Sequence, residues 1–405
     1  MPELVIEVWP CRPEELRAAF SPIFHYFGRA PSEEGVESTA RVLPAERMHA
    51  AWEDGVVVGG AGAYPFELTV PGGRVPAAGV TVVGVLPTHR RRGVLRSMLR
   101  AQLDGVHERG EPVAFLWASE DQIYTRFGYG RASLQGEVEV LRTHAGFGEP
   151  LERRGRLRLL ERDEAAVALP PIHERVAART PGMFRRSADW WDVQFLSDPP
   201  WRRRDRGELQ HALLELDGEP AGYALYRLSL SFGRGSSTGV VDVVEALGTS
   251  PQAVAELWRF LLDVDWMERI SATLLPIDHP LLLLMADPRR LRFTLVDGIM
   301  VRLVDVGAAL AARSYAGEGG VVAEVRDAFC PWNEGRWLLG ANAARTDAEP
   351  ELRLDVSALG AVYLGGFTFG ELQRAGKVEE LAPGAVARAD ELFRTDRAPW
   401  CPEIF

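Results

Sequence analysis

The pattern of apolar and polar positions divides the chain into three sections, and the first opens with short helical stretches. Apolar residues at helical spacing predict helices over Pro13 to Phe20 and Ser32 to Ala40. The pattern then changes to apolar runs separated by glycine-containing turns, which is typical of strands joined by hairpins. These runs predict strands over 48–52, 56–70 and 75–87.

An amphipathic helix and a buried strand complete the first section. One apolar face is predicted for the helix, formed by Val94, Leu95, Met98, Leu99, Leu103 and Val106. Arg109 and Gly110 end the helix, and the apolar run 113–119 predicts a short strand. Strands, helix and strand in this order are expected of a mixed α/β domain.

The second section repeats this order in weaker form. A hairpin over 210–228 turns at Asp217 and Gly218 and is followed by a strand over 240–247. Ser250 caps the next helix, 251–264, and Pro251 occupies its first position. A strand over 273–277 follows. The repeat predicts a second copy of the same fold.

The third section contains a further mixture of helices and strands. It predicts a helix over 308–315, a helix capped near Ser357 and another over about 384–393, with strands near 320–325, 335–339 and 352–356. The stretch 286–289, which contains Asp287 and Pro288, is a suitable boundary. The expected domains are therefore 1–145, 146–288 and 289–405, and they are expected to pack together because no long linker separates them.

Composition narrows the class of protein. The 405 residues carry a formal net charge of −11, which disfavours nonspecific binding of nucleic acid and favours cationic small molecules. The three cysteines form no zinc or disulfide pattern, and the N-terminus does not resemble a signal peptide. The longest apolar run, near 281–286, is too short to span a bilayer. We therefore expect a cytoplasmic protein with no metal, no nucleic-acid partner and no membrane partner.

A dense basic loop lies between the third predicted strand and the following helix. His89, Arg90, Arg91 and Arg92 precede Gly93 at the start of the helix. Free backbone N–H groups at a helix N-terminus bind anions, and arginine adds charge-assisted hydrogen bonds to phosphate oxygens. Neither a P-loop nor a Rossmann glycine pattern is present. The loop predicts a pyrophosphate site that needs no metal; an ordinary exposed arginine loop is the alternative.

Two stretches carry a resemblance to a known family. The sequence VLPTHRRRGV, 85–94, resembles the acetyl-CoA motif of the GNAT superfamily, although Leu95 departs from its usual final Gly or Ala. The longer stretches 76–100 and 118–130, the latter reading ASEDQIYTRFGYG, resemble the enhanced intracellular survival (Eis) acetyltransferases. The resemblance implies an α/β (α+β) fold of tandem GNAT-like domains, the second without the basic loop, followed by a sterol-carrier-protein-like domain.

The resemblance also implies roles for individual residues around bound acetyl-CoA. Backbone groups of Val83, Gly84 and Val85 would contact the pantetheine arm and the thioester. The pyrophosphate would be held by Arg90, Arg91, Arg92, Gly93, Val94, Leu95 and Arg96, and the cofactor would be lined by Ser119 and Glu120. Tyr124 would be the general acid that protonates the departing thiolate, and a core aromatic is its alternative role. Tyr129 is the expected core residue.

The chain end and one aromatic cluster complete the candidate site. The last eight residues include two prolines and three large apolar side chains, which predicts an anchored end. The resemblance implies that the terminal carboxylate of Phe405 is the general base, whereas composition alone is equally compatible with a simply docked tail. Phe24, His25 and Tyr26 could form an aromatic wall for an amine or the core face of a helix.

The resemblance therefore implies an N-acetyltransferase that transfers acetyl directly from acetyl-CoA to a primary amine. The resemblance implies aminoglycoside or polyamine substrates, lysine side chains as a further possibility, and assembly as a homohexamer. A non-catalytic module that binds acyl-CoA or lipid is the alternative. A nucleic-acid-binding regulator is a weaker alternative because the chain is acidic.

Overall fold

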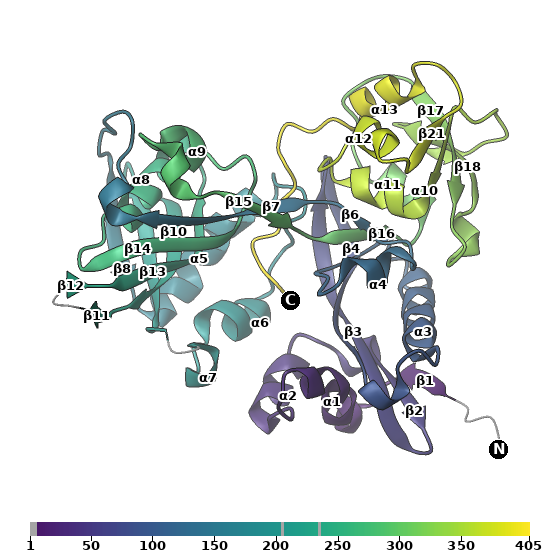
Figure 1. The fold of residues 1–405 in the computed structure, drawn as a ribbon, viewed down its shortest axis with the longest axis horizontal. Coiled ribbons are helices and arrows are strands. Elements are labelled where there is room, and N and C mark those ends of the chain that lie inside the picture. The colour runs from purple at the N-terminus through teal and green to yellow at the C-terminus, as the bar shows by residue number, and fades with distance from the viewer. Residues whose placement is uncertain (1–5, 204–205, 234–235) are drawn as a thin grey trace. The chain divides into compact units, whose positions relative to one another are not determined.

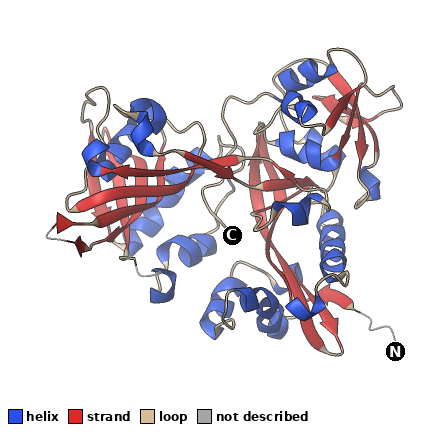
Figure 2. Ribbon diagram, viewed as in Figure 1, coloured by secondary structure: helices blue, strands red, loops and turns tan. Residues whose placement is uncertain are grey.

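The computed structural model describes residues 6–203, 206–233 and 236–405 (Figure 1). These residues form two compact units. The first contains the described residues up to 133 together with 299–396 and 404–405, and the second contains 134–298 and 397–403. Both units contain helices and strands (Figure 2). Within the described ranges, no helix has the length and apolar character needed to cross a membrane.

The first sheet is built mainly from the predicted hairpins. Its strands run in the order β1 (Glu7–Pro10), β2 (Met48–Glu53), β3 (Val56–Val70), β4 (Gly73–Val85), β5 (Val113–Leu116), β16 (Met300–Leu303) and β6 (Gly130–Arg131). The β2–β3 turn places Asp54 at φ 49° and Gly55 at φ 75°, the left-handed conformations that a tight hairpin turn requires. The three predicted strands of this region are confirmed.

Helices cover both faces of this sheet. Helix α1 (Leu16–Tyr26) approaches β3 so closely that a Cβ on Gly60 would lie 2.1 Å from the Ala19 carbonyl oxygen. Helix α3 (Val94–Glu108) packs Val94 and Met98 on the other face. Helix α2 (Glu33–Ala40) begins where predicted, because the Ser32 hydroxyl accepts a hydrogen bond from the Gly35 amide. The short helix α4 is Asp121–Thr125.

Two strands lie outside the domains that the sequence predicts for them. β7 (Leu134–Leu141) pairs with β14 and β15 of the second sheet, so the chain leaves the first sheet after Ser133 and not at 145. β16 pairs with β5 and β6 of the first sheet, so the chain returns to the first unit at Ile299 and not at 289. The predicted boundaries thus differ from the observed ones, because each strand pairs with residues far away in the sequence.

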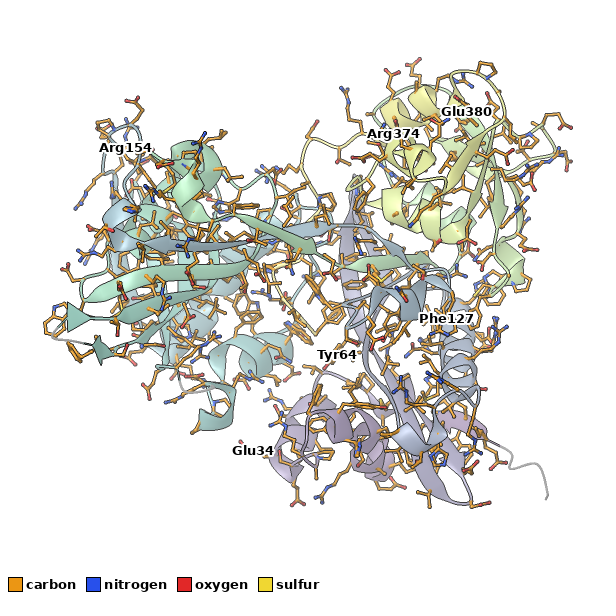
Figure 3. All side chains as sticks on the ribbon, viewed as in Figure 1. Glu34, Tyr64, Phe127, Arg154, Arg374 and Glu380 are labelled. Carbon is orange, nitrogen blue, oxygen red and sulfur yellow. The ribbon has the colours of Figure 1, made fainter. Side chains whose placement is uncertain are left out.

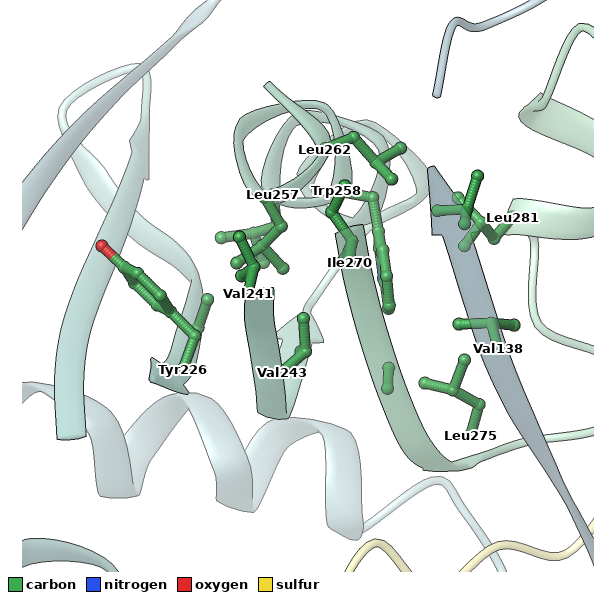
Figure 4. Close-up of a cluster of buried hydrophobic side chains, with 14 of the residues drawn as sticks. Val138, Tyr226, Val241, Val243, Leu257, Trp258, Leu262, Ile270, Leu275 and Leu281 are labelled. Atoms are coloured by element: carbon green, nitrogen blue, oxygen red, sulfur yellow. The ribbon is translucent and has the colours of Figure 1, made fainter. Parts of the chain in front are cut away.

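The second sheet follows the order of the predicted repeat. Its strands are β15 (Thr294–Asp297), β7, β14 (Met267–Leu275), β13 (Gly239–Gly248), β10 (Glu219–Ser229), β9 (Leu209–Leu216) and β8 (Gly155–Leu160), and β11 (Phe232–Gly233) pairs separately with β12 (Ser236–Ser237). Helix α8 (Pro251–Leu262) starts at the predicted cap, Ser250. Its Leu257, Trp258 and Leu262 pack over β13, β14 and β7 (Figure 4).

The remaining helices of the second unit surround this core. Helix α5 (Arg162–Ala177) packs on β10 and β13, and Trp191 contacts both His173 of α5 and Tyr223 of β10. Trp191 begins a π-helix that ends at Leu196. The shorter helices are α6 (Ala188–Trp190), α7 (Pro200–Arg203) and α9 (Leu281–Leu284). The α5 helix contains Pro170 and Pro171 and lies outside the helices that the sequence pattern predicts.

The C-terminal region forms a third sheet with helices. Its strands are β19 (Ala344–Arg345), β18 (Gly335–Gly340), β17 (Gly320–Arg326), β20 (Leu352–Asp355) and β21 (Val378–Glu380), and its helices are α10 (Val306–Ala311), α11 (Val356–Tyr363), α12 (Phe369–Arg374) and α13 (Ala385–Phe393). α10 begins two positions before the predicted start because Asp305 caps it. Asp355, not Ser357, caps α11 and accepts a hydrogen bond from the Ser357 amide.

This C-terminal region packs on the first sheet within the first unit. Arg302 of β16 is fully buried and forms an ion pair with Asp327. A Cβ on Gly128 would fall 1.9 Å from Arg302 Nη1, and one on Gly130 would fall 1.8 Å from the Ser357 carbonyl oxygen. The two glycines of the FGYG stretch therefore make room for this packing.

Candidate active site

Two parallel strands of the first sheet diverge at the candidate site. β4 pairs with β5 only from Ala77 opposite Val113 to Val80 opposite Leu116, where β5 ends. β4 continues to Val85, so its residues after Val80 have no ladder partner on β5. Backbone N–H and C=O groups along such an edge can pair with an extended ligand. The β4 edge beyond the last pair, named the opening here, can pair with an amide-containing chain.

A β-bulge shapes this edge. Gly84 lies opposite Gly60 and Thr81 opposite Gly62, so Val82 and Val83 together face one residue of β3. Val82 has φ 45°, an unfavourable conformation for a β-branched residue. The bulge redirects the backbone just before Val83, Gly84 and Val85. Sequence reasoning missed Val82, because nothing in the local pattern marks a valine with positive φ.

Gly84 itself serves the packing of a helix. A Cβ at this position would lie 2.7 Å from the backbone of Ile23 in α1, so only glycine allows the helix to approach. Gly84 therefore allows a close approach of two backbones, and the partner is α1. Tyr26, also on α1, donates a hydrogen bond to the Val85 carbonyl at 2.8 Å. Helix α1 thus holds the end of the diverging strand.

The N-terminus of α3 follows the same strand. Gly93 is the N-cap residue, with φ 85°, and a Cβ there would meet nothing within 4 Å. Glycine is favoured at this position by its backbone conformation, and the space above it is open. The first N–H groups of α3 lack intrahelical partners, so they and the helix dipole present a site for an anion.

The four basic residues of the loop divide into two pairs. His89 Nε2 lies 2.8 Å from Glu53 Oε2, and Arg92 binds both carboxylate oxygens of Glu53. The hydrogen bond from Arg92 lowers the pKa of Glu53. In contrast, Arg90 and Arg91 are exposed, and neither forms an ion pair with a described residue. Arg92 and His89 hold the loop to the β2–β3 turn, whereas Arg90 and Arg91 are available to a ligand.

The other residues predicted around the cofactor have distinct environments. The side chain of Val94 is buried and Leu95 packs beside it, so their possible contribution is through backbone groups. The Arg96 guanidinium lies 5.2 Å from the ring centre of Phe329. Ser119 and Glu120 are exposed in the loop after β5, where Glu120 is the N-cap of α4. Glu53 and Phe329 were not predicted from the sequence.

Tyr124 and Tyr129 are both buried, but only one hydroxyl group is fully enclosed. Their rings contact each other edge to face, with centroids 5.9 Å apart. The Tyr129 hydroxyl is buried without a hydrogen-bond partner, which confirms Tyr129 as a core residue. Tyr124 retains 7% of its surface, and burial raises its pKa to about 12. A neutral phenol at the edge of the core is the state in which Tyr124 can donate a proton.

Phe405 packs on the opposite face of β4 and β5. Its ring centre lies 5.0 Å from that of Phe115 and 5.3 Å from that of Phe66. The contact with Tyr64 is longer, 6.4 Å (Tyr64 is labelled in Figure 3). A Cβ on Gly79 would fall 3.2 Å from the Phe405 ring, so glycine makes room for the chain end.

Both faces of the first sheet border the opening. Side chains alternate along a strand, so Phe66 and Tyr64 share the face of Gly60 and α1. Tyr124 belongs to a cluster on the other face that includes Val80 and Leu116. Val80 and Leu116 are the last paired residues of β4 and β5, and Gly79 and Phe115 immediately precede them. Phe405 and Tyr124 therefore approach the start of the opening from opposite faces of the sheet.

The aromatic residues of α1 are spread over its surface. Phe24 is half-buried, contacts Phe27 edge to face, and lies under the Arg29 guanidinium at 5.4 Å. His25 and Tyr26 are exposed, with ring centres 5.7 Å apart. Tyr26 has the structural hydrogen bond to Val85 described above. Among the described residues, no group of three or more His, Cys, Asp or Glu side chains could hold a metal ion.

Comparison with known domain families agrees with this architecture. Two acetyltransferase (GNAT) domain models match residues 7–132 and 182–303, and a sterol carrier protein domain model matches residues 306–402. These matches confirm the predicted order of tandem GNAT domains and a sterol-carrier-like domain.

Individual relatives match over most of the chain. An uncharacterized N-acetyltransferase of Streptomyces avermitilis is 41% identical over 93% of this chain and 94% of its own length. The N-acetyltransferase Eis of Mycobacterium tuberculosis is 37% identical over 84% of each chain. The crystal structure of Eis1 from Mycobacterium abscessus superimposes with a TM-score of 0.85 and 35% identity, covering 98% of this chain and 100% of that one. The chain is an acetyltransferase and belongs to the Eis family of the GNAT superfamily.

Proposed function

We propose that this acetyltransferase binds acetyl-CoA in the opening between β4 and β5 and transfers the acetyl group directly to a primary amine. The divergence of the two strands beyond Val80 and Leu116 is the observation that carries the proposal. The unpaired backbone of β4 can accept the amide groups of a pantetheine arm. The N-terminus of α3 lies at the end of the same strand, where a pyrophosphate would meet free N–H groups.

Arg90 and Arg91 supply the side-chain part of the proposed phosphate contact. Both are exposed and form no ion pair with a described residue, so binding a pyrophosphate breaks no existing salt bridge. Arg92, in contrast, would have to leave Glu53 in order to reach a phosphate. We assign Arg92 a role in shaping the loop and the two preceding arginines a role in binding.

Tyr124 and the terminal carboxylate of Phe405 are proposed to act as acid and base. The amine nitrogen attacks the carbonyl carbon of the thioester, the C–S bond breaks, and the nitrogen gives up a proton to the base. The departing thiolate receives a proton from Tyr124. The placement of Phe405 and Tyr124 on opposite faces of the sheet supports this division of roles. The attacking amine and the departing sulfur occupy different sides of the same carbon, so the base and the acid need separate positions around it.

The raised pKa of Tyr124 affects this step. At about 12 it lies above the ordinary thiol pKa of about 8.5, so proton transfer to a free aqueous thiolate would be unfavourable. Burial raises the pKa of a thiol for the same reason that it raises that of a phenol. A thiolate formed against Tyr124 in a closed site is therefore a stronger base than in water, and the transfer accompanies the breaking of the C–S bond.

The proposed acceptors are aminoglycosides and other polyamines, with lysine side chains as a further class. The net charge of −11 attracts cations, and α1 offers exposed His25 and Tyr26 with half-buried Phe24 on the face where Phe405 packs. From the family resemblance alone, we also propose a homohexamer. Light scattering would then give a mass six times that of the 44.7 kDa chain.

Release of CoA from acetyl-CoA, measured across a panel of amines, tests the proposed reaction. The panel contains aminoglycosides, linear polyamines and a lysine peptide. We expect amine-dependent release of thiol, with acetylated amine formed in equal amount. Binding of acetyl-CoA without release in the presence of any amine would contradict the proposal and would identify the chain as an acyl-CoA-binding module.

A further inference from the structure

The second sheet contains a parallel pair that corresponds to β4 and β5. β13 and β14 pair from Gly239 opposite Met267 to Val243 opposite Ala272, and α8 connects them as α3 connects β4 and β5. Both strands continue beyond their last pair, β13 to Gly248 and β14 to Leu275. A bulge precedes the end of β13, as one does in β4. The second domain thus has its own divergence of strands.

The C-terminal segment 397–403 lies at this divergence and contacts β14 directly. The Trp400 amide donates a hydrogen bond to the Pro181 carbonyl at 2.8 Å, and its indole N–H donates one to the Leu274 carbonyl of β14. The Ala398 amide donates to Asp278 Oδ2 at 3.1 Å. A Cβ on Gly182 would fall 3.0 Å from the Trp400 carbonyl oxygen, so glycine accommodates the segment. One backbone–backbone hydrogen bond and two between backbone and side chain fix the position of the segment.

A buried arginine joins the segment to β13. Arg186 Nε donates to Glu403 Oε1 at 2.8 Å, and its Nη2 donates to Glu245 Oε2 at 2.6 Å. The side chains of Arg186 and Glu245 are fully buried, and that of Glu403 is 6% exposed. Glu245 lies on β13 beyond the last residue that pairs with β14. Arg186 therefore bridges the strand and the chain end.

Neighbouring donors satisfy the rest of this cluster. The Trp190 indole donates to Glu403 Oε2 at 2.6 Å, and the Tyr223 hydroxyl donates to Glu245 Oε1 at 2.5 Å. The Arg186 guanidinium lies 3.7 Å from the ring centre of Phe195. Burial alone would lower the pKa of Arg186, but Glu245 and Glu403 outweigh it and raise the pKa. The cation persists, and both oxygens of Glu403 accept a hydrogen bond.

We propose that Arg186 and Glu245 form a receptor for Glu403, which docks the C-terminal segment in the divergence of β13 and β14. They are positioning residues for the carboxylate of Phe405, and this part rests on the proposed role of that carboxylate as base. Phe405 follows Glu403 by two residues, which span at most about 7 Å of extended chain. An anchored Glu403 therefore restricts the carboxylate to a small volume, and a catalytic group held in this way reacts faster than a freely moving one.

Two variants and one matched control test the receptor. Glu403→Gln keeps the size of the side chain but places an amide against one of the two donors, and Arg186→Met removes the cation. Glu111→Gln is the control, because Glu111 also forms a buried fork with an arginine, Arg47, at 2.7 and 3.0 Å. The Glu403 variant lies in the tail, so it remains informative if Arg186→Met lowers the melting temperature.

The first readout does not depend on acetyl transfer. A carboxypeptidase that prefers aromatic ends is added to each protein, and the loss of Phe405 is followed by mass spectrometry. We expect release to be at least about 10-fold faster in both receptor variants than in the native chain and unchanged in Glu111→Gln, because proteolysis follows the population of the opened state. Native-like release in both receptor variants would overturn the proposal.

The second readout separates this proposal from the proposed function. We expect kcat for acetyl transfer to fall about 10-fold or more in the receptor variants, with acetyl-CoA affinity by calorimetry unchanged. Faster release of Phe405 with native kcat would overturn the positioning role, whereas the role of the carboxylate as base is tested separately by extension of the chain after Phe405. A fall in kcat without faster release would equally contradict docking as the cause.

Discussion

At the scale of single residues, neighbouring side chains of the same type have different roles because their surroundings differ. Tyr124 and Tyr129 share one aromatic contact, yet only Tyr129 has a hydroxyl enclosed without a partner. Arg92 is bound to Glu53, whereas Arg90 and Arg91 are free of ion pairs among the described residues. These differences depend on non-local neighbours, and they lead to three predictions.

Tyr124→Phe removes the hydroxyl and keeps the ring. We expect kcat to fall by about 10²-fold or more, because general acid catalysis contributes at least this much. Acetyl-CoA affinity and the melting temperature should change little. Tyr129→Phe is the matched control: it removes an unsatisfied buried hydroxyl, so neither the rate nor the melting temperature should fall. Near-native turnover in Tyr124→Phe would show that Tyr124 is a core aromatic and not the general acid.

The pKa of Tyr124 predicts the alkaline side of the pH profile. An acid must be protonated to act, and a group with a pKa of about 12 remains protonated as the pH rises toward that value. We therefore expect kcat to show no descending limb up to about pH 10. Stopped-flow measurement of CoA release between pH 6 and about pH 10 checks this. A fall in kcat near pH 8 in the native chain, absent in Tyr124→Phe, would contradict the raised pKa.

Two substitutions at Gly93 separate charge from backbone conformation. Gly93→Asn and Gly93→Asp have similar size, both face open space, and Asn and Asp both tolerate positive φ better than other residues do. Only aspartate adds negative charge at the proposed pyrophosphate site. We expect Gly93→Asp to weaken acetyl-CoA binding, measured by calorimetry, at least about 10-fold more than Gly93→Asn does. Equal acetyl-CoA affinities of the two variants would show that the pyrophosphate does not bind at this helix terminus.

At the scale of elements, the strands and the chain end acquire their roles from partners far away in the sequence. β4 is predicted as a strand, but its bulge and its separation from β5 make it a candidate ligand edge. α1 supports that edge through Tyr26 and the glycine contact at Gly84. The C-terminal segment contributes Phe405 to the first unit, while 397–403 pack in the second.

Extension of the chain after Phe405 tests whether the terminal carboxylate is the general base. Added Gly-Ser residues keep the Phe405 ring but convert its carboxylate into an amide. Phe405→Leu keeps the carboxylate and replaces the ring contacts with Phe66 and Phe115. We expect the extension to suppress acetyl transfer by about 10²-fold and Phe405→Leu to lower it less, with acetyl-CoA still bound in both. If the extended enzyme is as fast as the native one, the base is another group.

At the scale of the whole molecule, exchange of strands links segments that the sequence separates. The first sheet needs β16, which follows the second GNAT-like domain in the chain, and the second sheet needs β7, which precedes it. Arg302 and Asp327 then join this sheet to the C-terminal region with a buried ion pair. The folding unit is therefore assembled from non-consecutive segments, unlike the consecutive domains that the sequence pattern predicts.

A truncation and a fusion test this organisation. The fragment 1–145 keeps β7 without its partners and lacks β16, so the apolar edge of β5 is exposed and we expect aggregation. A fusion of 1–133 to 299–405 through a short Gly-Ser turn removes 134–298 only. The Ala132 amide donates to the Ile299 carbonyl at 2.9 Å, so the joined ends are adjacent. We expect the fusion to unfold cooperatively in calorimetry; a soluble, cooperative fragment 1–145 would contradict the exchange.

The local pattern of the sequence was sufficient for the elements and the family. Apolar runs with glycine turns placed the hairpins, the segment 32–40 placed α2, and the cap Ser250 placed the start of α8. The basic loop with the stretch containing Tyr124 indicated the Eis family, which the relatives confirm. These features depend on residues close together in the chain, so their physical cause is visible in the sequence.

Only the tertiary structure decided which surfaces meet. β7 reads LQGEVEVL and β16 reads MVRL, and nothing in either local pattern specifies the sheet that the strand joins. Glu53 is one of 57 acidic residues, and its contact with Arg92 depends on the position of the β2–β3 turn. The receptor role of Arg186 likewise depends on a tail residue, Glu403. Hydrophobic periodicity determines which face of an element is buried, whereas the partner of that face is selected by packing and pairing across the whole fold.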